Sequence, residues 1–369
     1  MAYEYSEDNL IEQTAIDLFY HQLGWDTQVA FNKESYGEGS TLGRLNKKEV
    51  VLKRNFLEKI KEFNPGLPDK AYEEAYEKLI EESITKSLEE LNFEKYLLLR
   101  NGIPVDYINE RGEQVRNKTI KVFDFENPDN NNFLAVRQLW IQGKSNRERR
   151  PDIIGFVNGI PLLFIELKAA HRKLENAYND NFTDYKDVIP SLFNYNAFVV
   201  LSNGIESRIG SVTGKYQHFH EWKRIAEEDE GIVALDRIIV GVCEKKRFLD
   251  LFENFILFDN SLGKVVKLIA RNHQFIGVNK AIENIRHKEE LYKLGKISLE
   301  EKQKLGVFWH TQGSGKSYSM VFFCQKIHHK FTGSYTFLIV TDRNELDTQI
   351  YGTFSGIGAV PQVKSGSRD

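Results

Sequence analysis

Three charged residues stand in an otherwise apolar stretch of the sequence, residues 152–168, "DIIGFVNGIPLLFIELK". Asp152 precedes one apolar run, and Glu166 and Lys168 lie at the end of the next. Two carboxylates held close together away from water repel each other unless a cation neutralises them. Mg²⁺ prefers carboxylate oxygens and lowers the pKa of the water that it binds. With a lysine to orient water or to stabilise charge on phosphorus, this set predicts a metal-dependent site that cleaves phosphodiesters.

The site depends on how the two strands pair. Asn-Gly at 158–159 between apolar runs is a strong hairpin signal. A plain two-residue turn would put Asp152 and Glu166 on opposite faces of the sheet. A three-residue loop, or an equivalent bulge, would set Asp152 across from Glu166 with Lys168 on the same face. We predict the loop or the bulge; the alternative is a surface salt bridge between Glu166 and Lys168 with an unrelated Asp152.

A second chemical signal is "HTQGSGKS" at 310–317, between an apolar run and a helical pattern. It matches the phosphate-binding pattern G-x-x-x-x-G-K-[ST], except that His310 takes the place of the first glycine. In such a loop the backbone N–H groups face the phosphates, Lys316 reaches the β and γ phosphates, and the Ser317 hydroxyl completes the shell of a Mg²⁺ ion. We therefore predict a nucleotide site formed by Thr311, Gln312, Gly313, Ser314, Gly315, Lys316 and Ser317.

The residues around this loop indicate a helicase-type ATP motor. Gln274 in "RNHQ" lies upstream, where such motors place a glutamine that reads adenine; an ordinary surface glutamine is the alternative. In "TDRNELDTQ", Thr341 and Arg343 are predicted to hold a DNA backbone phosphate. The Asp-Glu pair that activates water in such motors and the arginines of a second lobe are missing from the sequence. We therefore expect this chain to bind ATP poorly and to hydrolyse almost none.

The composition sets the frame for these sites. The chain has 369 residues, 41% of them hydrophobic and 28% charged, which predicts two globular domains. The net charge of −3 gives no general attraction for nucleic acid, so a basic surface has to be local. Two well-separated cysteines argue against disulfides and zinc and for a reducing cytosol. Since we find neither a signal peptide nor a run near the roughly 20 apolar residues of a membrane span, we expect a cytoplasmic protein without membrane partners.

Periodicity predicts the elements that position the sites. Helices are expected over 7–23, 47–62 and 69–99. Buried strands are expected in "TIKVFDF", "NFLAVRQLWIQ", "DIIGFV", "PLLFIELK" and "NAFVVLSNG", with "AYNDNFTDYKDVIPSLF" helical. A boundary near Asn260 gives domains 1–260 and 261–369. In the second, "VKLIARNHQFIGVNKAIENIRHKEELY" is expected to be mainly helical, and strand "GVFWH", a helix and strand "SYTFLIVTD" form a βαβ unit, so the chain is expected to be the front part of something longer.

These motifs together resemble the restriction subunit of type I restriction-modification enzymes. The resemblance rests on "QLWIQGKSNRERRPDIIGFVNGIPLLFIELK", "EDNLIEQ", "IPSLFNYNAFVVLSNG", the phosphate loop and "TDRNELDTQ". It implies an α/β fold: a PD-(D/E)xK nuclease domain whose mixed sheet is flanked by helices, followed by the start of a RecA-like parallel α/β helicase domain. It also implies that Asp152 and Glu166 hold Mg²⁺ and that Lys168 assists attack on the phosphodiester.

The same resemblance implies further site residues. An acidic residue on the first helix often completes the metal site, which points to Glu12, with Glu7 as the second choice and an exposed helix charge as the alternative. A Q-x-x-x-Y motif that supports the site or contacts DNA has Asn181 and Tyr185 at the corresponding positions, with asparagine for glutamine. Four basic residues near Asp152 are expected to carry a DNA phosphate, unless they are solvated loop charges: Lys144, Arg147, Arg149 and Arg150.

The function that the resemblance implies is DNA restriction by a large complex. The subunit would join methyltransferase and specificity subunits, translocate double-stranded DNA with ATP, and cut at a distance from an unmethylated target. Two alternatives use the same residues. One is a repair nuclease-helicase without methyltransferase partners, and the other is a nucleotide-gated DNA-binding module whose acidic residues are structural.

Overall fold

The computed structural model describes residues 7–109, 111–231, 234–261 and 263–357, with no side-chain description for residues 7–9. The chain divides into two compact units. Unit 1 contains Met1–Lys223 and Glu230–Glu253, and unit 2 contains Arg224–Asp229 and Asn254–Asp369. Unit 2 begins before Asn260 because strand β11 (Ile256–Asp259) pairs with β12 (Val266–Ile269) across that position.

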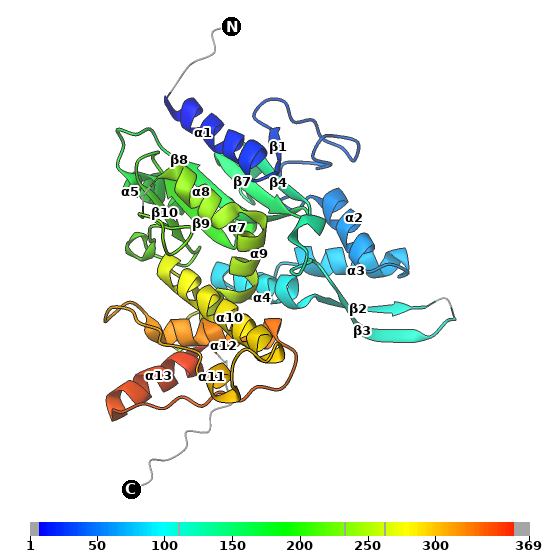
Figure 1. Cartoon of the computed structure of the whole chain (residues 1–369). Coiled ribbons are helices and arrows are strands. Elements are labelled where there is room, and N and C mark those ends of the chain that lie inside the picture. The colour runs from blue at the N-terminus through cyan, green and yellow to red at the C-terminus, as the bar shows by residue number, and fades with distance from the viewer. Residues whose placement is uncertain (1–6, 110, 232–233, 262, 358–369) are drawn as a thin grey trace. The chain divides into compact units, whose positions relative to one another are not determined.

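A six-stranded mixed sheet forms the centre of unit 1 (Figure 1). Its spatial order is β1 (Asp26–Val29), β4 (Phe133–Arg137), β7 (Ile153–Val157), β8 (Ile160–Leu167), β9 (Phe198–Ser202) and β10 (Ser207–Gly210). The pairs β1–β4 and β8–β9 are parallel, and the other three pairs are antiparallel. Every residue of β7, β8 and β9 is buried, which explains why these strands read as continuous apolar runs rather than alternating ones.

The β7–β8 hairpin combines a tight turn with a bulge. Asn158 and Gly159 both have positive φ, 50° and 77°, as a two-residue turn of this kind requires. The turn pairs Val157 with Ile160, so a three-residue loop is the wrong form. The register then shifts by one residue between Phe156 and Gly155, because Leu162 is extra in β8, and Ile153 pairs with Ile165. The predicted equivalent bulge is therefore confirmed, and the next opposed pair is Asp152 and Glu166.

Aromatic side chains pack helices against the sheet of unit 1. Phe248 of α9 (Lys245–Asn254) contacts Phe133 of β4 and Phe198 of β9. Phe164 of β8 contacts rings of the segment that connects β8 to β9, namely Phe182, Tyr185 and Phe193. That segment consists of α5 (Leu174–Asn176), the π-helical turn η3 (Ala177–Phe182), α6 (Thr183–Val188) and α7 (Pro190–Phe193). The strands are therefore held rigidly, with only their ends available for chemistry.

The remaining helices of unit 1 partly match the predicted ranges. The first is α1 (Glu7–Asp17), which continues as the π-helical turn η1 (Leu18–Gln22). The predicted helix 69–99 is wrong as a single helix: its first part ends at Ile80, and Ser87 caps the start of a second helix, its hydroxyl oxygen accepting from the Glu90 N–H at 3.3 Å. The helices in this part of unit 1 are α2 (Lys53–Phe63), α3 (Asp69–Ile80), α4 (Leu88–Asn101) and α8 (Leu235–Cys243), with short 3-10 turns at Pro128–Asn130 and Tyr216–His218.

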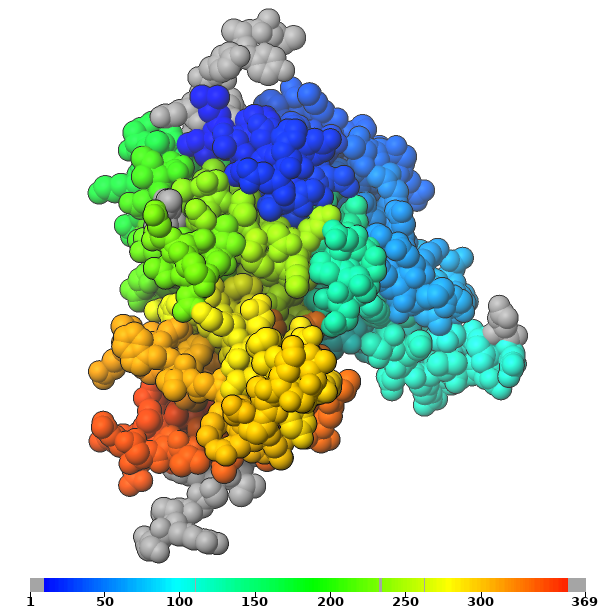
Figure 2. Space-filling view, in the orientation of Figure 1, coloured from blue at the N-terminus to red at the C-terminus, as the bar shows by residue number. Residues whose placement is uncertain are grey.

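Two small hairpins lie outside the central sheet. In the first, β2 (Ile103–Ile108) pairs with β3 (Gln114–Ile120), and both strands extend away from α3 and α4 (Figures 1 and 2). The predicted strand "TIKVFDF" contributes only its first two residues to β3. In the second, β5 (Ile141–Gln142) pairs with β6 (Glu148–Arg149).

Unit 2 does not form the predicted βαβ unit. It contains α10 (Asn272–Lys293), α11 (Leu299–Gln303), α12 (Lys316–Lys330) and α13 (Asn344–Gly356) beside the β11–β12 hairpin. Residues 306–310 and 334–341 are not strands, and Val307 and Leu338 are 93% and 87% exposed. A parallel strand needs neighbours that satisfy its backbone groups, and within the described residues none pairs with either segment. In the part that the structure describes, no helix is sufficiently long and apolar to cross a membrane.

Candidate functional site

The strand directions bring the predicted nuclease residues to one end of the sheet. Asp152 lies just before β7, whereas Glu166 and Lys168 lie at the end of β8, which runs antiparallel to β7. The Leu167 N–H donates to Asp152 Oδ2 at 2.7 Å, so the side chain of Asp152 bridges to the end of β8. The bulge thus brings both carboxylates and the lysine into one neighbourhood.

Glu166 is the most enclosed of the three residues, with 1% of its surface exposed. Its Oε1 accepts from Lys168 Nζ at 3.3 Å and from the side-chain amide of Asn181. Its Oε2 is buried and has no hydrogen-bond partner among the described residues. The protein therefore holds one carboxylate oxygen in place and leaves the other available as a ligand.

The electrostatics of this pair favour a bound cation. Burial raises the pKa of Glu166 well above its usual range, and the negative charge of Asp152 raises it further, while Lys168 and Asn181 act in the opposite direction. A buried carboxylate beside a second acidic group is stable in its charged form only when a cation compensates it. Carboxylate oxygens suit Mg²⁺, which keeps several waters and needs few protein ligands. The residues present therefore fit a hydrated divalent cation.

Glu12 is not part of this pair. It is buried on α1, where its Oε2 accepts from Arg137 Nε at 2.6 Å and from Gln138 Nε2 at 2.8 Å. The backbone N–H of Gln138 donates to the carbonyl oxygen of Asp152 at 2.8 Å, so Gln138 connects Glu12 to the backbone of Asp152. Among the described residues, no three His, Cys, Asp or Glu side chains are grouped so that they could hold a metal ion.

The Asn181 and Tyr185 side chains both face the acidic pair. Asn181 donates to Glu166, as described above, and is a site residue that sequence reasoning named only as a departure from the expected glutamine. Tyr185 is buried, and its hydroxyl donates to the carbonyl oxygen of Arg150 at 3.4 Å. Its pKa is raised, first by burial and then by the charges of Glu166 and Asp152. The spacing of Asn181 and Tyr185 was the available signal for this contact.

The predicted basic run does not form one continuous cationic surface. Lys144, at the tip of the β5–β6 hairpin, is 76% exposed and pairs with Glu82 at 3.0 Å. Arg149 forms two hydrogen bonds with the carboxylate of Asp184, one of them from Nη2 at 2.9 Å. Arg147 is exposed at the hairpin tip. Two of these three charges are already compensated by carboxylates.

Arg150 has a different environment from the rest of the run. Its guanidinium carbon lies 4.4 Å from the centre of the Phe31 ring and 5.2 Å from that of Trp140. Neither aromatic residue was singled out in the sequence, because each comes from a separate loop.

The predicted phosphate loop leads directly into a helix. Gly313 and Gly315 have φ values of 77° and 86°, conformations that favour glycine, and α12 begins at Lys316. Lys316 Nζ donates to the carbonyl oxygens of His310 at 2.7 Å and Thr311 at 3.3 Å. Gln312 lies in the same turn and Ser317 in the first turn of α12. Through these two bonds, the Lys316 side chain connects the start of the loop to the beginning of α12.

Gln274 is a buried support of this loop rather than a surface glutamine. Its Nε2 donates to Gly315 O at 2.9 Å, and its Oε1 accepts from the Arg271 N–H at 2.8 Å. The neighbouring His273 contacts the next carbonyl, with 3.0 Å between its Nε2 and Ser314 O, and sequence reasoning missed it. Two consecutive loop carbonyls are therefore held from the start of α10.

The other two predicted DNA-binding residues precede α13. Thr341 is partly buried, and Arg343 is exposed with its Nε 3.8 Å from Asp342 Oδ2.

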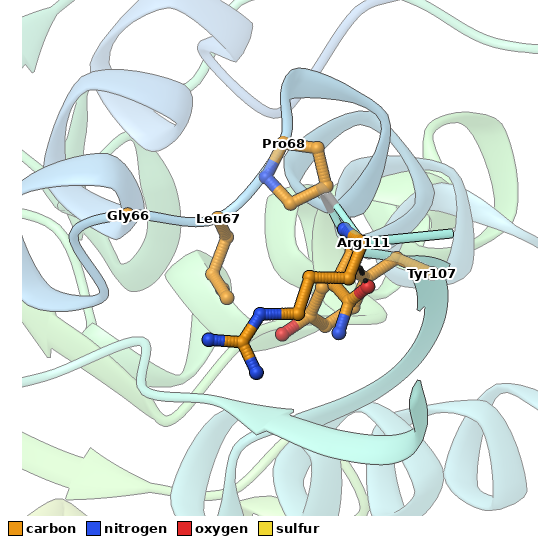
Figure 3. A pocket seen from close by; sticks show the side chains of 6 residues that line it. Gly66, Leu67, Pro68, Tyr107 and Arg111 are labelled. Carbon is orange, nitrogen blue, oxygen red and sulfur yellow. Dashed lines mark hydrogen bonds between the residues drawn. The ribbon is translucent and has the colours of Figure 1, made fainter. Parts of the chain in front are cut away.

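A shallow cleft lies elsewhere, between the β2–β3 hairpin and the loop that leads into α3. Figure 3 shows Arg111 and Tyr107 from the hairpin opposite Leu67 and Pro68 from the loop. None of the residues predicted from the sequence to be functional lines it. The cleft therefore gives no support to the predicted sites.

The fold and these two sites describe a mixed α/β protein with an acidic pair at the end of a sheet and a phosphate-type loop before a helix. The family model "Type I restriction enzyme R protein N terminus" matches residues 4–218, and the model "SWI2/SNF2 ATPase" matches residues 273–368. The chain therefore belongs to the family of type I restriction enzyme R protein N termini, which confirms the resemblance drawn from the motifs.

Two relatives extend this similarity along almost the whole chain. The type I restriction enzyme HindI endonuclease subunit of Haemophilus influenzae is 36% identical over 94% of this chain and 32% of its own length. The putative type I restriction enzyme MjaIXP endonuclease subunit of Methanocaldococcus jannaschii is 30% identical over 95% of this chain and 34% of its own length. The chain thus spans about a third of the length of these relatives.

Proposed function

We propose that this chain carries the DNA-cleaving site and part of the ATP-dependent DNA motor of a type I restriction-modification complex. The observation that carries the proposal is the buried Glu166 beside Asp152, with one oxygen held by Lys168 and Asn181 and the other without a partner among the described residues. We propose that a PD-(D/E)xK nuclease domain, predicted as residues 1–260, corresponds to unit 1, and that a RecA-like motor domain, predicted as residues 261–369, corresponds to unit 2, which takes residues 224–229 and 254–260 as well.

Asp152 and Glu166 would hold Mg²⁺ through their side-chain oxygens. A Mg²⁺ ion bound there would supply Lewis-acid chemistry, lowering the pKa of water and neutralising charge on the scissile phosphate. The protein holds the two ligands from both sides. Leu167 fixes Asp152 Oδ2, and Asn181 fixes Glu166 Oε1, so that Glu166 Oε2 is left for the cation.

Lys168 would act on the attacking water and on the phosphate. Its side chain is 16% exposed, and its ammonium nitrogen lies 3.3 Å from Glu166 Oε1, so Lys168 lies between the buried carboxylate and solvent. From there it can donate a hydrogen bond to a water or to a phosphate oxygen while it keeps Glu166 oriented. Hydrolysis of the phosphodiester then proceeds on rigid strands, which limits the motion of the reacting groups.

We propose supporting roles for the remaining predicted residues of the nuclease site and of the DNA contacts. Glu12 can serve as a third metal ligand only if it leaves Arg137 and Gln138. Tyr185 supports the site from within, since it is buried and bonded to the backbone of Arg150. The proposed contacts to the phosphates of double-stranded DNA are made by Lys144, Arg147, Arg149, Arg150, Thr341 and Arg343.

Residues 310–317 would bind ATP, with Gln274 holding the loop in shape. Lys316 would exchange the two loop carbonyls for the β and γ phosphates, since a charged oxygen is the stronger acceptor. We propose that the chain itself hydrolyses almost no ATP, because the acidic pair of a complete motor is missing. The proposed partners are methyltransferase and specificity subunits in the cytoplasm.

The test compares cleavage with translocation in a complex reconstituted with a subunit that joins this chain to a complete motor. Asp152→Ala and Lys168→Ala should each abolish cutting of unmethylated plasmid DNA while ATP hydrolysis and translocation continue. Lys316→Ala should stop translocation. Unchanged cutting in Asp152→Ala would refute the nuclease assignment and favour a DNA-binding module, and failure to co-purify with a methyltransferase would favour a repair nuclease.

A further inference from the structure

We propose that Phe31, Trp140 and Arg150 form a subsite that binds one nucleotide of the cleaved DNA strand next to the scissile phosphodiester. The subsite rests on the proposed nuclease function, because it lies beside Asp152 and would have no role without a DNA strand there. It adds two aromatic residues and singles out one arginine of the basic run.

The sheet topology brings these residues to the same end as the acidic pair. Phe31 follows β1, Trp140 follows β4, and Arg150 precedes β7. Because β1 and β4 are parallel and β7 is antiparallel to them, the ends of β1 and β4 meet the beginning of β7. Neighbouring strands are about 5 Å apart, so the subsite spans roughly 10 Å from the strand of Asp152. A strand of DNA that crosses this end of the sheet would contact both the subsite and the acidic pair.

Arg150 is oriented by aromatic rings instead of by a carboxylate. Its guanidinium lies over Phe31 and Trp140, and among the described residues it forms no ion pair. Stacking uses the face of a guanidinium and leaves its in-plane N–H donors available. Those donors match two oxygens of a phosphate. By contrast, two N–H donors of Arg149 already bond to the carboxylate of Asp184.

The aromatic part of the subsite is built into the fold. Arg44, which is fully buried, donates from Nη2 to the carbonyl oxygen of Trp140 at 2.9 Å and so holds the backbone of that residue. Lys47 lies 5.4 Å from the centre of the Trp140 ring, but it pairs with Glu148 at 2.7 Å, so Arg150 remains the cation that the subsite offers to a phosphate. Phe31 is 40% exposed, so one part of its ring covers Arg150 while another part remains open to a ligand.

An exposed ring beside an uncompensated guanidinium fits a nucleotide better than an isolated phosphate. The phosphate takes the in-plane donors of Arg150, and the base or sugar lies against Phe31. Aromatic rings accept bases of any sequence. This suits a protein whose own chain shows no base-reading module, since the contact gives position without sequence preference.

The experiment measures binding of a fluorescein-labelled 12-nucleotide single strand and of the matching duplex to the full chain in EDTA, by anisotropy at several salt concentrations. Arg150→Ala should weaken single-strand binding about tenfold and lower the slope of log Kd against log salt by about 0.7. Phe31→Ala should weaken binding about fivefold with an unchanged slope. Phe31→Tyr should restore binding, whereas Phe31→Leu, which keeps apolar volume without a ring of electrons, should not.

Arg116→Ala is the matched control, because Arg116 is an exposed arginine of unit 1, on β3, that is not among the proposed DNA contacts. It should change Kd by less than about twofold. If Phe31→Ala and Arg150→Ala bind like the wild type, or if Arg116→Ala weakens binding equally, the subsite is refuted. Loss of cleavage in Asp152→Ala would still support the nuclease in that case, so the two proposals fail separately. Unchanged thermal unfolding of Phe31→Ala excludes a folding defect.

Discussion

Replacing Glu166 with glutamine should stabilise the metal-free protein and remove its response to Mg²⁺. Glu166 is buried, its pKa is raised by burial and by Asp152, and its Oε2 has no hydrogen-bond partner among the described residues. Glutamine has nearly the same shape but no charge, and its amide can donate to a nearby acceptor. The substitution thus removes the cost of an ionised carboxylate in this place.

The expected size of this stabilisation follows from one buried atom, Glu166 Oε2, which has no hydrogen-bond partner among the described residues. Leaving such a group without a partner costs about 1–3 kcal/mol, and more when it is charged. We therefore expect Glu166→Gln to raise the free energy of unfolding by about 1–3 kcal/mol in EDTA at neutral pH. Saturating Mg²⁺ at 100 times its Kd should stabilise the wild type by about 2.7 kcal/mol and leave the variant unchanged. The difference between the two stabilities then changes by about 2.7 kcal/mol in favour of the wild type, which reverses the order when the advantage of the variant in EDTA is smaller than that.

The pH dependence of the free energy of unfolding provides a second, independent test of the raised pKa of Glu166. The folded-state pKa of Glu166 lies above the ordinary value of 4.5, so the folded state holds its proton to higher pH than the unfolded state. This contribution to stability is complete below pH 4.5 and is lost as the pH rises toward the folded-state pKa. In Glu166→Gln that loss should be absent.

Urea denaturation of both proteins in EDTA and in Mg²⁺ measures these effects. Glu58→Gln is the control, because Glu58 is exposed on α2 of the same unit. A variant that is less stable than the wild type in EDTA, or that gains as much as the wild type from Mg²⁺, would refute the reasoning about a buried, cation-requiring carboxylate.

Three further predictions concern other parts of the chain. Burial lowers the pKa of Lys267 to about 7, so the free energy of unfolding should rise between pH 7 and 10.5, by at most about 5 kcal/mol, and urea titration of Lys267→Met should show no such rise. Asn158→Ala should lower the free energy of unfolding by about 3 kcal/mol or more, because the Asn158 side chain bonds to Asn132 N, Val122 O and Asn131 Oδ1. Asn158→Gly should be about 1 kcal/mol more stable than Asn158→Ala, because glycine relieves the strain of the positive φ, and equal urea midpoints for the two variants would contradict this. Lys316→Ala should weaken binding of a fluorescent ATP analogue at least about tenfold, and an unchanged Kd would exclude the loop.

Local signals in the sequence were sufficient for the parts of the protein that short-range physics controls. Asn-Gly at 158–159 adopts two left-handed conformations in any context, so the hairpin could be predicted. The glycines before Lys316 similarly predicted a tight loop and a following helix. The need for a bulge also followed, since alternation along a strand leaves Asp152 and Glu166 on one face only if one residue is extra.

Contacts between distant segments decided the rest. The bulge lies at Leu162. The side-chain amide that donates to Glu166 belongs to Asn181, in a helical segment that the sequence alone could not orient. The strands expected around 306–310 and 334–342 did not form, because strand pairing depends on neighbours and not on apolar composition.

The sequence by itself therefore determined which residues have the right chemistry and where the chain must turn, because those properties depend on residue type and on spacing along the backbone. Only the tertiary structure decided which acidic residue keeps one buried oxygen without a hydrogen-bond partner among the described residues, which is already neutralised, as Glu12 is by Arg137, and which arginine remains available. Burial and charge compensation arise from residues far apart in the chain, and they depend on the packing of the whole sheet.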